Sequence, residues 1–463
     1  MALALVYIDK ISLFFIKLFY KKLRMSLYIT IIILGLLIFL SHVFNQLFDK
    51  TKIPNVLLLL LIGIIIGPVS GIVTIDFFGK LGNVFTTITL VVILFESGAG
   101  LHFREIKKAI GSATILTLLN FIITILITSW VSRWLLGVDV MSSVFIGAIV
   151  GGTSSAVVIP MVKQLKMGEK STSVLILESA LSDVLCLVVG LALLDGIAEN
   201  VMSPQMILLK MWKAFVFAII LGLLCGFLWS TFIGKIRSVK NSMFTTLAFV
   251  FVLYGVVELL RLNGGIAVLS FGIILGNIDG LGESKKFRKV FTFKSSGFNP
   301  NERDFFAEVV FIMQTYFFVY VGISLQFGVP AIYATGFLIV LLIIVFRIPG
   351  VVYLTGKNIT KPEKTIMAVM TPKGLVPAVL ASLPLQRGLA HGEIIIDLGY
   401  SIVLFSIVIC SLLVIMISLK PNLLDGFKKR RIETVGSEEI PFDVVQNNST
   451  EHNPSDNISG DKK

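Results

Sequence analysis

Residues 175–188 read LILESALSDVLCLV, and this stretch governs how the rest of the chain is interpreted. It lies in an apolar run between Lys170 and Asp195 that is long enough to cross a hydrocarbon core of roughly 30 Å as one helix. Yet the run carries two carboxylates, Glu178 and Asp183. A charge at mid-membrane costs about 2.5–3.5 kcal/mol even on the mildest scale, so such residues usually have a partner or face water.

The two acids point in different directions on the predicted helix. The five-residue step from Glu178 to Asp183 turns about 140° around the helix axis. Ser179 and Asp183, four residues apart, share a face. We therefore expect the two carboxylates to have different neighbours and different roles.

The composition is that of a polytopic membrane protein. Of the 463 residues, 56% are hydrophobic and 15% are charged, and the mean hydropathy is +0.93. The net charge of +12 is better explained by basic cytoplasmic loops than by nucleic-acid binding. The three cysteines lie in apolar runs, and the four histidines lack metal-ligand spacing. We therefore expect no disulfide framework, no metal enzyme and no cofactor.

Apolar runs recur along the chain and predict an all-α protein with about thirteen membrane spans. The runs are 26–46, 55–72, 81–100, 109–131, 141–163, 171–194, 206–231, 242–260, 264–279, 305–327, 330–355, 364–386 and 394–418. We expect three regions: a basic segment at 1–25, a membrane domain at 26–419, and a disordered cytoplasmic tail at 420–463. Met25 begins a clean spanning run and is an alternative start of the protein.

Basic residues collect in alternate loops, which sets the predicted orientation. Loops after the odd-numbered spans carry clusters of Lys and Arg, whereas the intervening loops hold at most one. The positive-inside rule then places the N-terminus outside and the C-terminus in the cytoplasm. The basic residues before Met25 disagree with this orientation, which is a second reason to question that segment.

Two spans are interrupted at matching places. The fifth contains GGTSSAVVIP (151–160), and the twelfth contains TPKGLVPAV (371–379). Interrupted helices at corresponding positions of two halves indicate a transporter site. Spans two to six and nine to thirteen would form two inverted five-helix repeats, with a discontinuous helix fourth in each. Thr153 and Asp183 both fall near the centres of their spans, which favours a hard-oxygen site for a small alkali cation.

Arg347, in the eleventh span, is the expected partner of Glu178. Both residues lie roughly 10–12 Å from the predicted cytoplasmic face. Pairing would offset two desolvation costs and leave Asp183 as the unpaired acid; the alternative is that Arg347 reaches the inner surface. Glu96 either lines an inner funnel or ends a solvated helix. Lys373 either balances the dipoles of the half-helices or reaches the surface.

These strings together resemble the monovalent cation/proton antiporter superfamily, most closely its electroneutral sodium/proton exchanger branch. The similarity covers about residues 27 to 418 and rests on four motifs in the expected order. The motifs are ILFESGAGLHFREI, ESALSD, FRIPG and TPKGLVPAVLASLP. The resemblance implies a transporter, not an enzyme, in a prokaryotic plasma membrane. It also implies a homodimer, with a dimerisation domain and a core domain that moves like an elevator.

The resemblance also implies residue roles. Asp183 is the expected carrier of cation and proton, Thr153 supplies an oxygen and Ser179 a hydroxyl to a transported alkali cation, and Glu178 and Arg347 form a bracing pair. Two positions depart from the family pattern. Ser182 stands where the family has Asn or Asp, and the broken helix reads Thr153-Ser154-Ser155 instead of Thr-Asp-Pro. The site has thus lost a carboxylate, for which Ser154 can compensate through its hydroxyl or a bound water. Ser154, Ser155 and Ser182 belong with Asp183, Thr153 and Ser179 to the expected cation- and proton-binding set.

With one carboxylate, proton and cation compete for Asp183, and we expect electroneutral 1:1 exchange of Na⁺ or Li⁺ for H⁺. Three transport alternatives stay open: an electrogenic exchanger, which needs a second acid; a K⁺/H⁺ antiporter; and a sodium-coupled organic anion transporter of the same fold. An integral-membrane enzyme or a receptor has little support, because the sequence offers no catalytic cluster near one membrane face.

Overall fold

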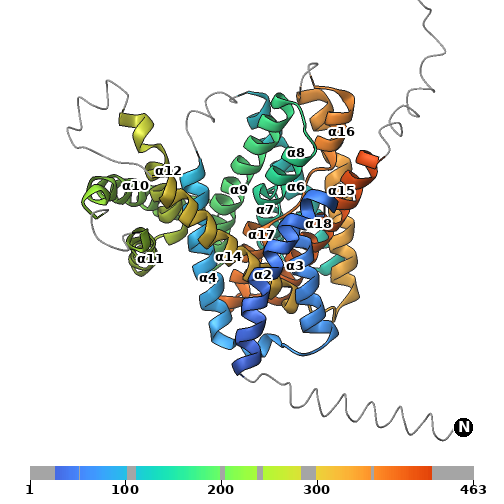
Figure 1. Cartoon of the computed structure of the whole chain (residues 1–463), viewed down its shortest axis with the longest axis horizontal. Helices are drawn as coiled ribbons and strands as arrows, with labels where there is room; N and C mark the ends of the chain where they lie inside the picture. Colours follow the sequence, from blue (N-terminus) through green and yellow to red (C-terminus); the bar gives the residue numbers. More distant parts are fainter. Residues whose placement is uncertain are drawn as a thin grey trace, which may run out of the picture. The chain divides into compact units, whose positions relative to one another are not determined.

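The computed structural model describes residues 27–51, 53–101, 111–198, 204–236, 243–282, 299–355 and 359–419. Within these ranges every regular element is a helix, which confirms the all-α prediction. The predicted basic segment at 1–25 and tail at 420–463 lie outside the described residues. The elements (Figure 1) are α2 (Leu27–Thr51), α3 (Asn55–Ile64), η1 (Ile65–Val69), α4 (Ile75–Gly100), α6 (Ser112–Leu136), α7 (Val140–Ile149), α8 (Ser155–Gln164), α9 (Glu169–Ala198), α10 (Pro204–Ile236), α11 (Met243–Leu259), α12 (Gly264–Gly282), α14 (Pro300–Ser324), α15 (Pro330–Leu354), α16 (Lys361–Val369), α17 (Leu375–Gln386) and α18 (Gly392–Leu419).

Each predicted span corresponds to a helix or to a broken pair of helices. Eight described helices are long and apolar enough to cross a membrane, and five shorter apolar helices account for the remaining spans. The fifth span divides into α7 and α8, and the twelfth into α16 and α17. The second span ends in a π-helical turn, η1, which contains Pro68. A proline lacks the backbone N–H that a regular helix uses there, which accounts for the irregular turn.

Local sequence signals set the helix ends around the crossing region. Gly137 adopts a left-handed conformation (φ 65°) and ends α6. The side chain of Asp139 then accepts a 3.1 Å hydrogen bond from the backbone N–H of Ser142 and starts α7. At α16, Thr360 and Glu363 form a capping box, in which each side chain accepts from the other residue's backbone N–H.

The helices pack in two groups. In the crossing group, α6, α7, α8, α9, α15, α16, α17 and α18 pack on one another. In the flanking group, α2, α3, α4, α10, α11, α12 and α14 do the same. Figure 1 shows α10, α11 and α12 on the side of α4 away from α6 and α7. The grouping places both broken helices in one compact set.

Two close helix crossings in the flanking group are related by the predicted repeats. α3 packs on α14, and α4 packs on α12. These pairs are equivalent if α3–α9 is one repeat and α12–α18 the other. Both crossings use glycines: a Cβ on Gly63 would lie 2.8 Å from the Cα of Gly322, and a Cβ on Gly272 would lie 3.2 Å from the Cα of Gly98. Small residues allow membrane helices to approach this closely.

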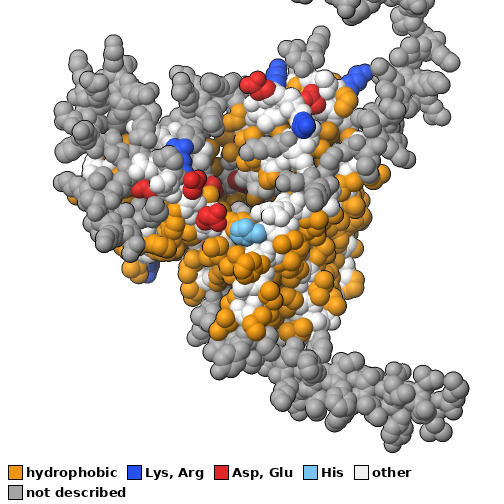
Figure 2. Space-filling view, viewed as in Figure 1, with side chains coloured by type: hydrophobic (Ala, Val, Ile, Leu, Met, Phe, Trp, Pro, Cys, Tyr) orange, Lys and Arg blue, Asp and Glu red, His pale blue; other side chains and the backbone are white. Residues whose placement is uncertain are grey.

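The outer surface matches a membrane protein. Figure 2 shows apolar side chains over much of the visible face, with Lys and Arg mostly near the α8 and α16 end. Large apolar residues such as Phe39 and Leu126 are exposed. Trp130 and Trp134 are also exposed and stack with their ring centroids 6.0 Å apart. Amphipathic aromatic rings of this kind favour the membrane interface.

Candidate ion-binding site

The two interrupted spans meet directly. The first break comprises residues 150–154, and the second comprises residues 370–374. The backbone N–H of Ser154 donates a 2.7 Å hydrogen bond to the carbonyl of Pro372. Gly374 lies against Ser154, where a Cβ would overlap the serine hydroxyl. A helix break leaves backbone groups without partners, and this crossing satisfies two of them.

A serine from the following helix binds each break. The hydroxyl of Ser182 on α9 accepts a 3.0 Å hydrogen bond from the N–H of Thr153. The hydroxyl of Ser406 on α18 accepts a 2.9 Å hydrogen bond from the N–H of Lys373. Each serine also donates to a carbonyl of its own helix. The two contacts are equivalent under the repeat relation and fix both breaks to the helices behind them.

Asp183 lies beside the first break and is 7% exposed. Its Oδ2 accepts a 2.9 Å hydrogen bond from the hydroxyl of Ser155, the first residue of α8. A Cβ on Gly152 would lie 3.3 Å from Oδ1, so a residue without a side chain leaves room for the carboxylate. The N-terminal end of a helix stabilises negative charge nearby. The arrangement therefore suits a carboxylate that binds a cation.

A cavity of about 150 Å³ leads to this carboxylate. Asp183 and Ser155 line it together with Glu96 and Ser97 of α4. The cavity thus lies between the crossing group and the flanking group. Figure 2 shows acidic side chains beside a hollow on the visible face, between the α10–α12 side and the α8–α9 side. Glu96 and Asp183 line the same cavity, and the role of Glu96 in an inner funnel stays a prediction.

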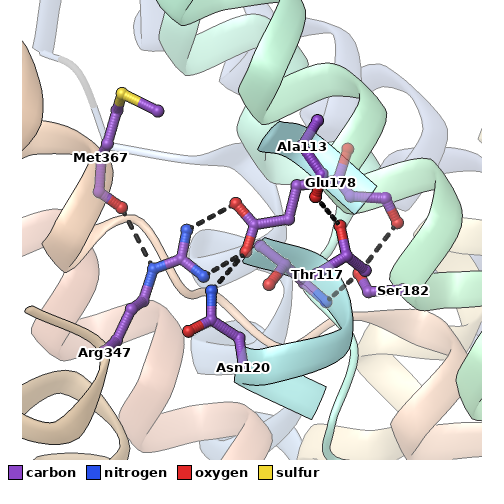
Figure 3. A network of polar contacts seen from close by, with 9 residues as sticks. Ala113, Thr117, Asn120, Glu178, Ser182, Arg347 and Met367 are labelled. Atoms are coloured by element: carbon purple, nitrogen blue, oxygen red, sulfur yellow. Dashed lines mark hydrogen bonds and ion pairs between the residues drawn. The ribbon is translucent and has the colours of Figure 1, made fainter. Parts of the chain in front are cut away.

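Glu178 faces away from this cavity and pairs with Arg347 (Figure 3). Both carboxylate oxygens accept from the guanidinium, with Nη2 2.7 Å from Oε2. Asn120 of α6 donates to Oε1 at 2.9 Å, and Arg347 Nε donates to the carbonyl of Met367 at 3.2 Å. Glu178 and Arg347 are 1% and 3% exposed. This network ties α9, α15, α6 and α16 together and leaves Glu178 no free oxygen for an ion.

A small polar cavity lies on the other side of the breaks. Thr153, Lys373, Arg347 and Asn120 line it, and its volume of about 10 Å³ is close to the minimum for one water molecule. The Oδ1 of Asn120 is buried and has no hydrogen-bond partner among the described residues. The side chain of Lys373 is 2% exposed, so it lies inside the protein and does not reach the surface.

A model of the sodium/hydrogen exchanger transmembrane family matches residues 35–423. The chain belongs to the sodium/hydrogen exchanger family. This match covers both breaks, the Asp183 region and the Glu178–Arg347 pair. Membership makes the chain a multi-pass membrane protein of a transporter family and not an enzyme.

Several relatives of this exchanger-family chain carry antiporter names. It is 23% identical over 386 residues to "K(+)/H(+) antiporter NhaP2" of Shewanella baltica (strain OS223), over 81% of this chain and 64% of that protein. It is 24% identical over 365 residues to "Probable Na(+)/H(+) antiporter 2" of Methanocaldococcus jannaschii, over 75% of this chain and 82% of that protein. The chain thus spans less than two thirds of the length of the Shewanella relative.

The fold of this exchanger-family chain is similar to that of the sodium proton antiporter MjNhaP1 from Methanocaldococcus jannaschii. The match has a TM-score of 0.66 at 23% identity and covers 86% of this chain and 98% of that one. At 23% identity the similarity establishes the fold alone and does not identify the transported ion.

The predicted site residues fall into three positions in the structure. Asp183 and Ser155 lie in direct contact, and Ser182 and Ser154 contact backbone atoms of the two breaks. Ser179 is fully buried and donates to the carbonyl of Ile176 at 2.9 Å, so its contribution to an ion stays a prediction.

Two contributors were missed by the sequence analysis: Asn120 and Ser406. Asn120 is an amide side chain in the apolar run 109–131, which was a signal for it because a buried amide needs hydrogen-bond partners. Ser406 lies 33 residues after Lys373, compared with 29 residues from Thr153 to Ser182, so the sequence alone gave only a weak signal for it.

Proposed function

We propose that this chain exchanges a monovalent cation for protons across the membrane, with Asp183 binding the two in turn. The observation that carries the proposal is the position of Asp183: a buried carboxylate, in contact with the Ser155 hydroxyl, at the crossing of two helix breaks and at the end of a cavity. Carboxylate, hydroxyl and backbone oxygens are the ligands that alkali cations prefer. Discontinuous helices at the crossing of two repeats support transport.

Competition at one carboxylate couples the two fluxes. A protonated Asp183 has no charge to hold a cation, and a cation on the carboxylate excludes the proton. The Ser155 hydroxyl contacts this carboxylate, and Thr153 and Ser179 are proposed as additional ligands. The crossing group would carry the loaded carboxylate from one side of the flanking group to the other.

We propose 1:1 electroneutral exchange, because the residue next to Asp183 is Ser182, whose hydroxyl is bound to the first break. Glu178, the other acid on α9 near the site, is neutralised by Arg347. The electrogenic alternative gains one candidate for its second acid, Glu96, which lines the Asp183 cavity. The two cases differ in whether the membrane potential, about 2.3 kcal/mol per charge per 100 mV, drives transport.

Na⁺ or Li⁺ is the proposed cation, and K⁺ is the alternative. The names of the relatives include both Na⁺/H⁺ and K⁺/H⁺ antiporters, at 22–24% identity. The acid-lined cavity, with Glu96 and Asp183, disfavours an organic anion as the substrate. Homodimer formation and a plasma-membrane location with the basic loops in the cytoplasm are part of the proposal. On that orientation, the Glu96 cavity opens towards the cytoplasm.

Proteoliposomes containing a pH-sensitive dye test the function directly. After a proton gradient is set, addition of Na⁺ or Li⁺ should release protons, with K⁺ giving a weaker response. The exchange rate at each cation concentration should be unchanged when a membrane potential is imposed. A potential-sensitive rate would contradict 1:1 exchange, and the absence of a response to all three cations would contradict exchange itself.

A further inference from the structure

A second cavity, of about 270 Å³, lies between the same two groups of helices as the Asp183 cavity. Polar side chains from both groups line it. Those from the flanking group are Asn83 and Thr87 of α4, Glu258 of α11 and Asn263, which precedes α12; those from the crossing group are Gln386 and Arg387 at the end of α17. Such a cavity can take a hydrated cation.

The two cavities lie along the same pair of helices. On α4 the second cavity ends at Leu90 and the Asp183 cavity begins at Glu96, about 9 Å farther along the helix. On α9 the second cavity is lined by Leu191, about 12 Å from Asp183. The order of the residues along both helices places the cavities in line, one on each side of the site.

Apolar side chains close the interval between the cavities. Leu94 is fully buried, and Leu191 is 3% exposed. Both lie against Gly265, where a Cβ would come within 3.0 Å of each. These three residues come from α4, α9 and α12, so the closure joins the flanking group to the crossing group. In this conformation Asp183 is open to the Glu96 side and closed to the other.

The charges around the second cavity leave one carboxylate available. Asp195 is engaged on both oxygens: Arg387 lies 2.7 Å from Oδ1, and Asn263 donates to Oδ2 at 3.0 Å. Glu258 accepts at Oε1 from the N–H of Gly264 at 2.9 Å. Its Oε2 has no hydrogen-bond partner among the described residues. Of the two carboxylates, Glu258 is therefore the one that has an oxygen left for a cation.

We propose that the second cavity is the cation entrance on the face opposite Glu96, and that Glu258 binds the cation there before it reaches Asp183. The Asn263–Asp195 hydrogen bond, which joins the flanking group to the crossing group, breaks when the entrance opens towards the site. This inference rests on the proposed exchange function. Glu258 would act only on cations that arrive from its own face, which a merely structural residue would not do.

Right-side-out and everted vesicles test this role, because each preparation presents one face to the assay medium. Glu258→Gln should raise the KM for the cation roughly threefold or more from the Glu258 face and leave the KM from the other face unchanged. Glu96→Gln should raise the KM for the cation from the Glu96 face and leave the KM from the Glu258 face unchanged. Glu393→Gln, an exposed acid in the first turn of α18 outside the cavity, is the matched control and should change neither KM.

The outcomes separate the two proposals. If the unmodified protein shows no cation/proton exchange, the proposed function fails and this inference fails with it. If exchange is intact and Glu258→Gln changes the KM equally from both faces, or from neither, only the entrance is wrong.

A thiol label gives an independent measurement. Thr87→Cys should react with a membrane-impermeant thiol reagent applied to the Glu258 face and not to the other face, with the parent protein and its three cysteines as the control. Labelling from the Glu96 face alone, or no labelling, would overturn the assignment.

Discussion

The Ser182 hydroxyl lies 3.0 Å from the backbone nitrogen of Thr153 and accepts its hydrogen bond. Ser182, the residue next to Asp183 in the sequence, thus holds the first break and adds no charge to the site. Ser406 makes the equivalent contact with Lys373 at the second break. Comparing variants of Ser182 and Ser406 therefore separates an effect on ion binding, expected at the first break only, from an effect on stability, expected at both.

Ser182→Ala and Ser406→Ala should each destabilise the protein by about 1–3 kcal/mol, because a buried N–H loses its acceptor. Only Ser182→Ala should also raise the KM for the cation, since the first break leads directly into Ser155 of α8, which contacts Asp183. Thermal unfolding in detergent and exchange kinetics in proteoliposomes provide the two measurements. An equal rise in the KM of Ser406→Ala would contradict the claim that only the first break contributes to ion binding.

Ser182→Asp would place a second acid beside Asp183. We expect exchange by this variant to respond to an imposed membrane potential, because two protons can then be exchanged for one cation. The rate is measured with and without the potential in the proteoliposome assay. Ser182→Asn is the uncharged control and should remain insensitive to the potential; an insensitive Ser182→Asp protein would count against single-carboxylate coupling.

The Glu178–Arg347 pair should serve stability and not ion binding. Glu178→Ala should cost about 3–5 kcal/mol, since it leaves Arg347 buried without its partner. Asn120→Ala should cost about 1.5–3 kcal/mol through one lost hydrogen bond to a charged group. The apparent unfolding temperature in detergent reports both. Glu178→Leu combined with Arg347→Met should recover much of the loss, and failure to recover any would show that the pair has a further role.

The Asp139 cap should contribute a pH-dependent stability outside the spans. Burial raises the pKa of Asp139, but the hydrogen bonds from Ser142 and the neighbouring His391 outweigh it, and the pKa is lowered from its usual 3.8. The stabilisation is therefore present above pH 3.8 and is lost as the pH falls through the lower folded value. Asp139→Ala should cost about 1 kcal/mol at neutral pH.

Unfolding of the Asp139→Ala protein is followed between pH 7 and pH 3. The difference in the free energy of unfolding between the Asp139→Ala protein and the parent should become smaller towards pH 3, because the parent loses its charged cap there. Asp139→Asn, which retains a cap without a charge, should lose less stability at neutral pH. If this difference in unfolding free energy instead becomes larger as the pH falls, the proposed link between the charge of Asp139 and stability is wrong.

Much of the fold could be predicted from particular residues. The apolar runs fixed the spans because a membrane requires backbone groups to be paired within each helix. Gly151 and Gly152 marked one break, and Pro372 and Gly374 marked the other, whereas Pro160 lies inside α8. Similar depths predicted Arg347 as the partner of Glu178, which the structure reproduces.

Other features required three-dimensional information. Ser179 shares a helical face with Asp183, but the hydroxyl in contact with Asp183 belongs to Ser155, whose direction depends on the backbone of a non-helical break. Asn120 could be suspected as a polar residue in an apolar run, but its partner depends on how α6 packs against α9. The π-helical turn at Pro68 similarly depends on local backbone geometry that a hydropathy pattern does not contain.

Ser155→Ala should weaken cation binding without abolishing exchange. The variant removes the hydroxyl that contacts Asp183, so the cation loses a neighbouring oxygen and the KM should rise about tenfold, the equivalent of 1.4 kcal/mol. Raising the pH should lower the KM in both proteins, because fewer protons compete. Ser173→Ala, at an exposed position on α9, is the control. An unchanged KM in the Ser155 variant would remove this residue from the site.

Proton and cation fluxes of Asp183→Asn, measured in the same proteoliposomes, test the central claim most directly. Asparagine keeps the shape of the side chain but cannot exchange a proton or hold a cation by charge. We predict that both fluxes fall to the level of empty liposomes at every pH, while the unfolding temperature shows that the protein remains folded. A folded Asp183→Asn protein that still exchanges cations for protons would contradict the account.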